Sequence, residues 1–338
     1  MDILYSQLGG ISMKFIDMHC DTLMYAATSG VSDLLEVQGS MLDIKRMKAS
    51  GASAEFFAIF FPPLEGESFE LAGRTFSDEE YFNLLYKCYK KTMQQGKDDI
   101  AEAMNADDIV RNELAGKMSG ILTLEDGRMI DGSLEKMKQY YEMGIRLITL
   151  TWNQENCFGF PNSTDATIMN KGLTPFGKEA IEYMNDLGIM IDVSHLSDGG
   201  FWDVAALSKK PFVASHSNCR ALSPHQRNLT DDMLKKLAEK GGVAGINFAP
   251  MFLNPDITIM DSKVEQLSLH LQRMIHVGGE DLPALGSDLD GIGGNLEISC
   301  ISKMDMLFER LKKDGLSERI IEKIAYTNAL NVIKETMK

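Results

Sequence analysis

Residues 174–195 read TPFGKEAIEYMNDLGIMIDVSH, and this stretch contains the structural unit from which the fold is predicted. Thr174 and Pro175 are residue types that favour the start of a helix. The residues after them have the amphipathic pattern of a helix, and the short apolar run 189–194 has the composition of a buried strand. His195 follows that run directly. A helix, a short buried strand and a polar residue at the strand end are typical of a parallel α/β sheet.

The same alternation of short apolar runs and longer amphipathic stretches recurs along the chain. The strand candidates are 15–19, 56–61, 120–124, 145–151, 189–194, 212–215, 242–247 and 283–286. Helical patterns are found at 78–94, 133–143, 174–187, 230–239 and 262–277, and after the last strand at 302–313 and 316–335. Eight strands that alternate with helices predict an α/β fold. A closed (β/α)8 TIM-like barrel with extra C-terminal helices is favoured, rather than an open doubly wound sheet.

The composition fits one large domain. The chain has 338 residues, of which 44% are hydrophobic and 25% charged, and α/β barrels of roughly 250 residues or more fold as one domain. No proline-rich linker or repeat divides the sequence. Residues 14–338 are therefore expected to form a single (β/α)8-barrel domain, and residues 1–13 an N-terminal extension.

The charge balance excludes several classes of partner. Lys and Arg number 34 against 49 Asp and Glu, a net charge of -15, whereas nucleic acids and anionic membranes select basic surfaces. No apolar run reaches the roughly 18 residues of a membrane span. The cysteines are scattered without close pairs, which fits a reducing cytoplasm. They are Cys20, Cys88, Cys157, Cys219 and Cys300.

Residues able to bind metal follow five of the eight predicted strands. Active sites of (β/α)8 barrels lie at the carboxyl ends of the strands, and imidazole with carboxylate is the ligand set expected for catalytic zinc. The residues at these ends are His19, Asp21, Glu125, His195, His216 and Asp288. A single histidine at a strand end is more often a hydrogen-bonded residue than a ligand, but three of the six histidines lie at three separate strand ends. The sequence therefore predicts a metal centre.

The order of the strands divides these residues between two ions. His19 and Asp21 are two residues apart and project to the same side, so they can hold one ion. His195 and His216 come from neighbouring strands and can hold a second. Glu125 comes from between them in the barrel circuit and is the natural bridging carboxylate. Two Zn²⁺ per chain are expected.

The segments around these positions resemble the membrane dipeptidase (renal dipeptidase) family, peptidase M19 of the amidohydrolase superfamily. The similar motifs are FIDMHCDTL at 15–23, LTLEDG at 122–127, DVSHLSD at 192–198, SHSNCRAL at 215–222, HQRNLTDD at 225–232 and GSDLDGI at 286–292. They occur in the family's order from about residue 14 to residue 332. The resemblance implies the same two sets of zinc ligands and the same bridging carboxylate.

The resemblance also implies roles for residues outside the ligand set. Arg227 matches the residue that binds the free carboxylate of the substrate, a role suited to a two-pronged guanidinium. Asp288 matches the aspartate that accepts and donates protons in the family's reaction. Trp152 stands where the family has a histidine that polarises the substrate, and this is a departure, because an indole N–H is a donor only.

The expected function is zinc-dependent hydrolysis of unblocked dipeptides, including L,D-dipeptides, by a hydroxide that bridges the metals. Glu125 and Asp288 are the expected catalytic residues, with Arg227, Trp152 and Asp288 at the substrate. Dimers are common among soluble proteins and in this family, so a homodimer is a further hypothesis.

Two alternatives remain open from the sequence. The same metals could serve another amidohydrolase reaction, such as deacylation of an N-acyl amino acid or cleavage of a β-lactam-type amide. The chain could instead be a binding barrel without catalysis, for which Trp152 is the one indication.

Overall fold

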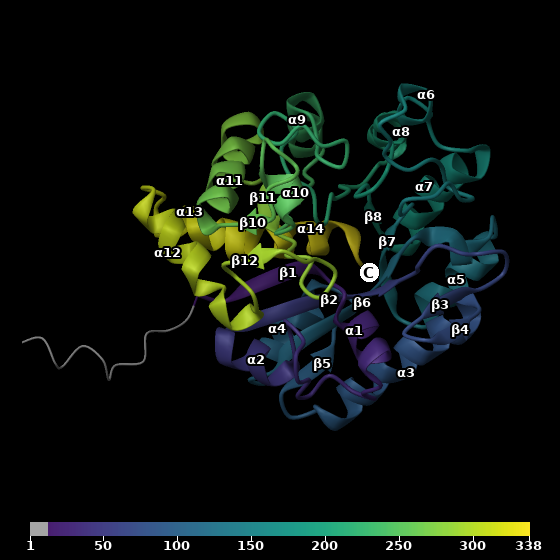
Figure 1. The fold of residues 1–338 in the computed structure, drawn as a ribbon, viewed down its shortest axis with the longest axis horizontal. Coiled ribbons are helices and arrows are strands. Elements are labelled where there is room, and N and C mark those ends of the chain that lie inside the picture. Colours follow the sequence, from purple (N-terminus) through teal and green to yellow (C-terminus); the bar gives the residue numbers. More distant parts are fainter. Residues whose placement is uncertain (1–12) are drawn as a thin grey trace, which may run out of the picture.

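A parallel sheet curled into a barrel lies at the centre of the molecule, with helices around it (Figure 1). The structure is a computed structural model that describes residues 13–338. The barrel strands are β1 (Phe15–Cys20), β2 (Ala52–Phe60), β6 (Met118–Glu125), β7 (Ile145–Thr149), β8 (Met190–Asp192), β9 (Ala244–Ile246) and β11 (Pro283–Leu285). Their hydrogen-bonded order is β8-β7-β6-β2-β1-β11-β9, and every neighbouring pair is parallel.

Residues 213 and 214 close this sheet into a barrel. Val213 forms a parallel bridge with Asp192 at the end of β8, and Ala214 forms one with Ala244 of β9. The Val213 N–H donates to Ile191 O at 2.9 Å, and the Ala214 N–H donates to Val243 O at 3.0 Å. The predicted closed barrel is confirmed, with the segment 212–215 shortened from the predicted strand to two bridges.

The shortening has a cause in the side chain of Asp192. Its Oδ1 accepts the backbone N–H of Ser215 at 2.8 Å and that of Ser194 at 3.0 Å. These two donors therefore bond to a carboxylate instead of a neighbouring strand, which ends β8 and the 212–215 segment at the same level. The backbones are also very close here, because a Cβ on Gly245 or on Gly286 would lie 1.8 Å from Ser215 O.

The predicted helices are present, with ends that differ by a few residues. The helices are α1 (Thr22–Ser29), α2 (Ile44–Ser50), α3 (Asp78–Gln95), α4 (Ala106–Leu114), α5 (Leu134–Glu142), α6 (Ala166–Met169), α7 (Pro175–Leu187), α8 (Asp198–Leu207), α9 (Asp231–Glu239), α10 (Pro250–Leu253), α11 (Val264–Gly278), α12 (Asp305–Lys313), α13 (Glu318–Glu322) and α14 (Asn328–Thr336). Thr174 and Thr230 cap α7 and α9 by accepting N–H groups of the first turn, as their residue types predict. Helices α12, α13 and α14 are the extra C-terminal helices.

Smaller elements complete the chain. They are β3 (Phe69–Leu71), β4 (Arg74–Phe76), β5 (Ile100–Glu102), β10 (Asp261–Ser262), β12 (Asn295–Leu296), the 3-10 turns Gly127–Ile130 and Ile301–Lys303, and a π-helical segment, Lys323–Thr327. Strand β5 was not predicted and pairs with the N-terminal end of β6. Between residues 13 and 338, no helix has both the length and the apolar character needed to cross a membrane. The predicted extension lies outside the described residues except for Met13.

Candidate metal centre

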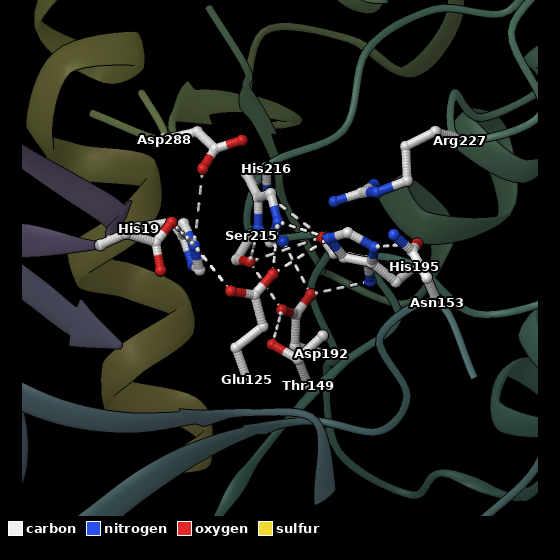
Figure 2. Close-up of polar contacts among 12 residues, drawn as sticks. His19, Glu125, Thr149, Asn153, Asp192, His195, Ser215, His216, Arg227 and Asp288 are labelled. Atoms are coloured by element: carbon white, nitrogen blue, oxygen red, sulfur yellow. Dashed lines mark hydrogen bonds and ion pairs between the residues drawn. The ribbon is translucent and has the colours of Figure 1, made fainter. Parts of the chain in front are cut away.

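The carboxyl ends of the barrel strands bring the predicted ligands together in one buried cluster (Figure 2). His19 lies near the end of β1, Glu125 ends β6, and His195 and His216 stand in the turns that follow β8 and the 212–215 segment. Asp21 is the residue before α1. His195 has a φ of 68°, a left-handed backbone conformation that costs free energy in a residue with a side chain. Strain of this kind is concentrated at functional sites in proteins.

The two oxygens of Glu125 face different histidines. Oε2 is 3.4 Å from His19 Nε2, whereas Oε1 is 3.0 Å from His195 Nε2 and 3.4 Å from His216 Nε2. On the side of Oε2, His19 Nε2 also lies 3.4 Å from Asp21 Oδ2. One carboxylate therefore stands between two groups of nitrogen and oxygen atoms, which is the arrangement of a bridging ligand.

The separations fit the spacing of ligands around a metal ion. Ligands about 2.05 Å from a tetrahedral ion lie about 3.3 Å from one another, close to the 3.0–3.4 Å found here. Among the described residues, His19 Nε2 and Asp21 Oδ1 are buried without a hydrogen-bond partner. The chemistry of the donor set therefore fits bound divalent cations.

The Nε2 atoms of the two histidines on the Oε1 side face each other. His195 Nδ1 lies 3.3 Å from Asn153 Oδ1 and His216 Nδ1 lies 2.7 Å from Ser215 Oγ, so both Nδ1 atoms have oxygen partners. The two Nε2 atoms are 3.1 Å apart. If both Nε2 atoms are unprotonated, their lone pairs repel each other at this distance unless a cation lies beside them.

Burial controls the charge of the three histidines in different ways. Burial, with the positive charge of Arg227, lowers the pKa of His195 to about 4, and burial with the charge of His19 lowers that of His216 well below its ordinary value. Neutral imidazoles are the form that binds metal. For His19, burial lowers the pKa, but the charges of Glu125 and Asp21 outweigh it and raise the pKa well above its usual range. The carboxylates around His19 thus require positive charge, which a metal ion would supply.

Asp288 borders the cluster on the side of His19. Its Oδ2 accepts the Asn247 side-chain N–H at 2.8 Å, and its Oδ1 lies 3.8 Å from His19 Nε2. Burial raises the pKa of Asp288 well above its ordinary value, and the charges of Asp21 and Glu125 add to this effect while His19 opposes it. Asp288 is therefore a buried carboxyl group with one fixed oxygen and one oxygen that faces the cluster.

A cavity of about 530 Å³ opens above the cluster and contains the side chain of Arg227. Arg227 is only 4% exposed, and its Nη1 donates to Ser217 Oγ at 2.5 Å. Within the described residues, its Nε and Nη2 are buried without hydrogen-bond partners. Burial lowers the pKa of Arg227 to about 10, so the side chain stays charged at neutral pH. A buried guanidinium with free donors in a cavity is a site for an anionic group of a ligand.

Trp152 forms part of the cavity wall. Its ring packs edge-on against Phe60 with centroids 4.8 Å apart, and lies 6.1 Å from the ring of His195. The remaining wall beyond the charged cluster is largely apolar, with Met24, Phe252, Met260 and Ile292 among its residues. Trp152 thus lies in the cavity beside the cluster of candidate ligands.

The structure adds polar residues that the sequence interpretation did not select. Asp192 is fully buried and accepts the hydroxyl groups of Thr149 and Ser215, each at 2.6 Å. His225 lines the cavity, and its Nδ1 accepts the backbone N–H of Arg227 at 3.1 Å. Their signals in the sequence were weak, because Asp192 stands within an apolar run and His225 stands in a loop. The Ser-His pair that occurs at both 194–195 and 215–216 could have drawn attention to Asp192.

The chain has relatives among known proteins. It matches the sequence profile of the membrane dipeptidase family, peptidase family M19, over residues 11–338. The chain belongs to this family. Membership agrees with the buried cluster of metal-ligand residues and supports a metal-dependent peptide hydrolase.

Relatives with known sequences and solved structures resemble the chain over most of its length. Dipeptidase tcpJ of Claviceps purpurea is 29% identical over 299 residues, which are 87% of this chain and 69% of that protein. The dipeptidase AC, a metallopeptidase of family M19, superposes with a TM-score of 0.85 and 27% identity, covering 96% of this chain and 99% of that one. A Rhodobacter sphaeroides metallopeptidase, solved with a phosphinate mimic of the dipeptide L-Ala-D-Ala, gives a TM-score of 0.84 and 27% identity with the same coverage.

Proposed function

We propose that this protein is a binuclear zinc dipeptidase that hydrolyses unblocked dipeptides, including those with a D-residue in the second position. The observation that carries the proposal is Glu125, whose two oxygens face the His19 side and the His195–His216 side of the cluster. The ligand sets are His19 with Asp21 and His195 with His216, and Glu125 belongs to both. The ligand-bound Rhodobacter relative supports an L,D-dipeptide as a substrate.

The residues of the chain have separate tasks in this reaction. When bound, the two zinc ions would lower the pKa of a water molecule to near neutrality and polarise the peptide carbonyl. Asp288 accepts a proton at Oδ1 and returns it to the leaving amine, while Asn247 holds its Oδ2. Arg227 binds the C-terminal carboxylate of the substrate, so the cavity selects short peptides with a free C-terminus.

A substrate panel on protein of known zinc content tests the proposal. It includes L,L-dipeptides, L,D-dipeptides, N-acyl amino acids and a β-lactam. Hydrolysis of free dipeptides with close to two zinc ions per chain is the expected result. Activity on N-acyl amino acids alone would identify another amidohydrolase reaction, and protein that binds no zinc would be a barrel without this catalysis.

Replacing Arg227 by Lys should weaken the use of free dipeptides. Lysine keeps the charge but cannot offer two parallel N–H groups to a carboxylate. Losing charge-assisted hydrogen bonds of about 2–3 kcal/mol lowers kcat/KM by about 30- to 150-fold. The matched measurement uses the same dipeptides with an amidated C-terminus, on which both proteins should be equally slow. Equal losses on both substrate series would remove Arg227 from carboxylate recognition.

Replacing Trp152 tests whether its indole N–H takes the place of the family's histidine. We expect Trp152→Phe, which keeps the aromatic contact with Phe60, to change turnover only a few-fold, because zinc supplies most of the polarisation. Trp152→Ala should chiefly change which substrate side chains are accepted. A hundred-fold fall in turnover for Trp152→Phe with zinc retained would instead show that the indole N–H donates to the oxyanion. One such donor contributes about 3–4 kcal/mol to transition-state stabilisation.

A further inference from the structure

A buried chain of hydrogen bonds leads from Asp192 through Ser215 to His216 (Figure 2). Asp192 Oδ2 accepts the Ser215 hydroxyl at 2.6 Å, and the same hydroxyl oxygen lies 2.7 Å from His216 Nδ1. We propose that Asp192 is a positioning residue that acts through Ser215 to keep the proton of His216 on Nδ1, so that Nε2 is free to bind metal. The inference rests on the proposed role of His216 as a ligand.

The donors around Asp192 determine the direction of each hydrogen bond. Its Oδ1 accepts the backbone N–H groups of Ser194 and Ser215, and its Oδ2 accepts the hydroxyls of Thr149 and Ser215. Four donors thus face one carboxylate group, which is an acceptor at both oxygens. Since the one hydroxyl proton of Ser215 is used towards Asp192, its oxygen can only accept from His216. The proton of neutral His216 must then be on Nδ1.

The residues of this hydrogen-bonded series have little freedom to rearrange. Ser215, His216 and Asp192 are at most 1% exposed. The backbone oxygen of Ser215 is packed so closely against Gly245 and Gly286 that a Cβ on either glycine would overlap it. The Ser215 hydroxyl therefore stays within reach of both its partners. A fixed tautomer and ring orientation are the usual contributions of such outer residues to a metal ligand.

Replacing Asp192 by Asn should reverse the direction of the hydrogen bonds from residue 192 through Ser215 to His216. The two backbone N–H groups at Oδ1 can only donate, so the amide oxygen must take that position and the amide NH2 must take the position of Oδ2. The NH2 then donates to Ser215, whose own proton turns towards His216 Nδ1. His216 would carry its proton on Nε2, where it blocks the metal.

The first test observes the tautomer in the metal-free protein, so it does not depend on activity. Protein labelled with ¹⁵N-histidine is studied by NMR, and the His216 signals are assigned from their loss in His216→Gln. We expect the Nδ1–H form in the wild type and the Nε2–H form in Asp192→Asn. An Nε2–H form in the wild type, or an unchanged tautomer in Asp192→Asn, would overturn the proposal.

The second test measures zinc affinity by competition with a chelator. The weaker of the two affinities should fall by about 10- to 100-fold in Asp192→Asn, the range typical for residues that support a metal ligand. Ser215→Ala, which removes the acceptor of the His216 proton, should lose a similar factor. The double variant should bind zinc no more weakly than either single variant, because each of the three variants breaks the same series of hydrogen bonds. Losses that multiply would show independent structural roles and contradict the relay.

Thr149→Val is the matched control. It removes the other hydroxyl that donates to Asp192 Oδ2, with little change in side-chain volume, and leaves the link to His216 intact. Its zinc affinity should stay close to that of the wild type. If Asp192→Asn fails to fold, Ser215→Ala decides, and unchanged zinc affinity in that variant would refute the relay. Failure of the proposed function is a separate result: a wild-type protein that binds zinc but hydrolyses no dipeptide.

Discussion

Glu125→Gln should reduce turnover by about a thousandfold or more and lower the zinc content from two ions to one or none. The carboxylate of Glu125 faces His19 with one oxygen and His195 and His216 with the other. A glutamine would keep one ligand oxygen and place an NH2 group, which cannot bind metal, against one of the two sides. Losing a metal ion removes several kcal/mol of transition-state stabilisation, which corresponds to a factor of about 10³.

The matched control for this change is Glu55→Gln. Glu55 is a second fully buried glutamate, on β2, and its register partner Gly120 lies on β6, the strand that ends in Glu125. Burial raises the pKa of Glu55 well above its ordinary value, and the charge of Asp17 adds to this effect. Burial therefore disfavours the charged form of Glu55, and a neutral amide of the same size is a close substitute. Zinc content and kcat should be unchanged in Glu55→Gln.

Zinc analysis and steady-state kinetics on both variants give the answer. Thermal unfolding of the zinc-depleted proteins shows whether the fold is intact in each case. A Glu125→Gln protein with two zinc ions and near-normal turnover would contradict the bridging role, and an equal loss in Glu55→Gln would show that any buried carboxyl in this region supports the site.

The fold was predictable because the strands and helices alternate regularly. Short apolar runs such as 189–194 and capped helices such as 174–187 have local signals, and both were confirmed. The exception is the segment 212–215, whose composition is that of a strand. Its pairing ends early because the Ser215 N–H bonds to the Asp192 carboxylate, and a contact between residues 23 positions apart leaves no local signal in the sequence.

The grouping of the candidate ligands was predictable for a geometric reason. Parallel strands of a barrel end on the same face, so histidines and carboxylates after several strands must lie together. The roles of Arg227 and Trp152 came only from the family resemblance, since nothing in a loop sequence shows that a guanidinium will be 4% exposed in a cavity. Asp192 was missed because an aspartate in an apolar strand gives no sign of the donors that will surround it.

Asp288→Asn should lower kcat by about 10²- to 10⁴-fold with little change in KM. The contribution of a positioned acid or base is of this size, and an amide cannot carry a proton from the attacking water to the leaving amine. Asn247 donates to Oδ2 of Asp288, so the asparagine keeps its oxygen there and turns its NH2 towards the cluster. The shape of the site is preserved while the proton carrier is lost.

Asp290 supplies the control for this experiment, since it stands two residues further along the same loop. Its Oδ2 accepts the Thr22 hydroxyl and its Oδ1 accepts the Met41 N–H, each at 2.6 Å. An asparagine can keep its oxygen towards the Met41 N–H, while the Thr22 hydroxyl turns to accept from the NH2. Asp290→Asn should therefore affect stability and leave kcat within a few-fold of the wild type.

Zinc content decides between two roles that the position of Asp288 allows. Its Oδ1 lies 3.8 Å from His19 Nε2, and Asp288 forms a possible ligand group with His19 and Asp21. A proton carrier should leave both zinc ions in place when it is changed to Asn, whereas a ligand should take one ion with it. Two zinc ions per chain with a hundred-fold or greater loss in kcat supports the proton role. Loss of one ion in Asp288→Asn, with none lost in Asp290→Asn, would make Asp288 part of the metal site and leave the proton transfer to another group.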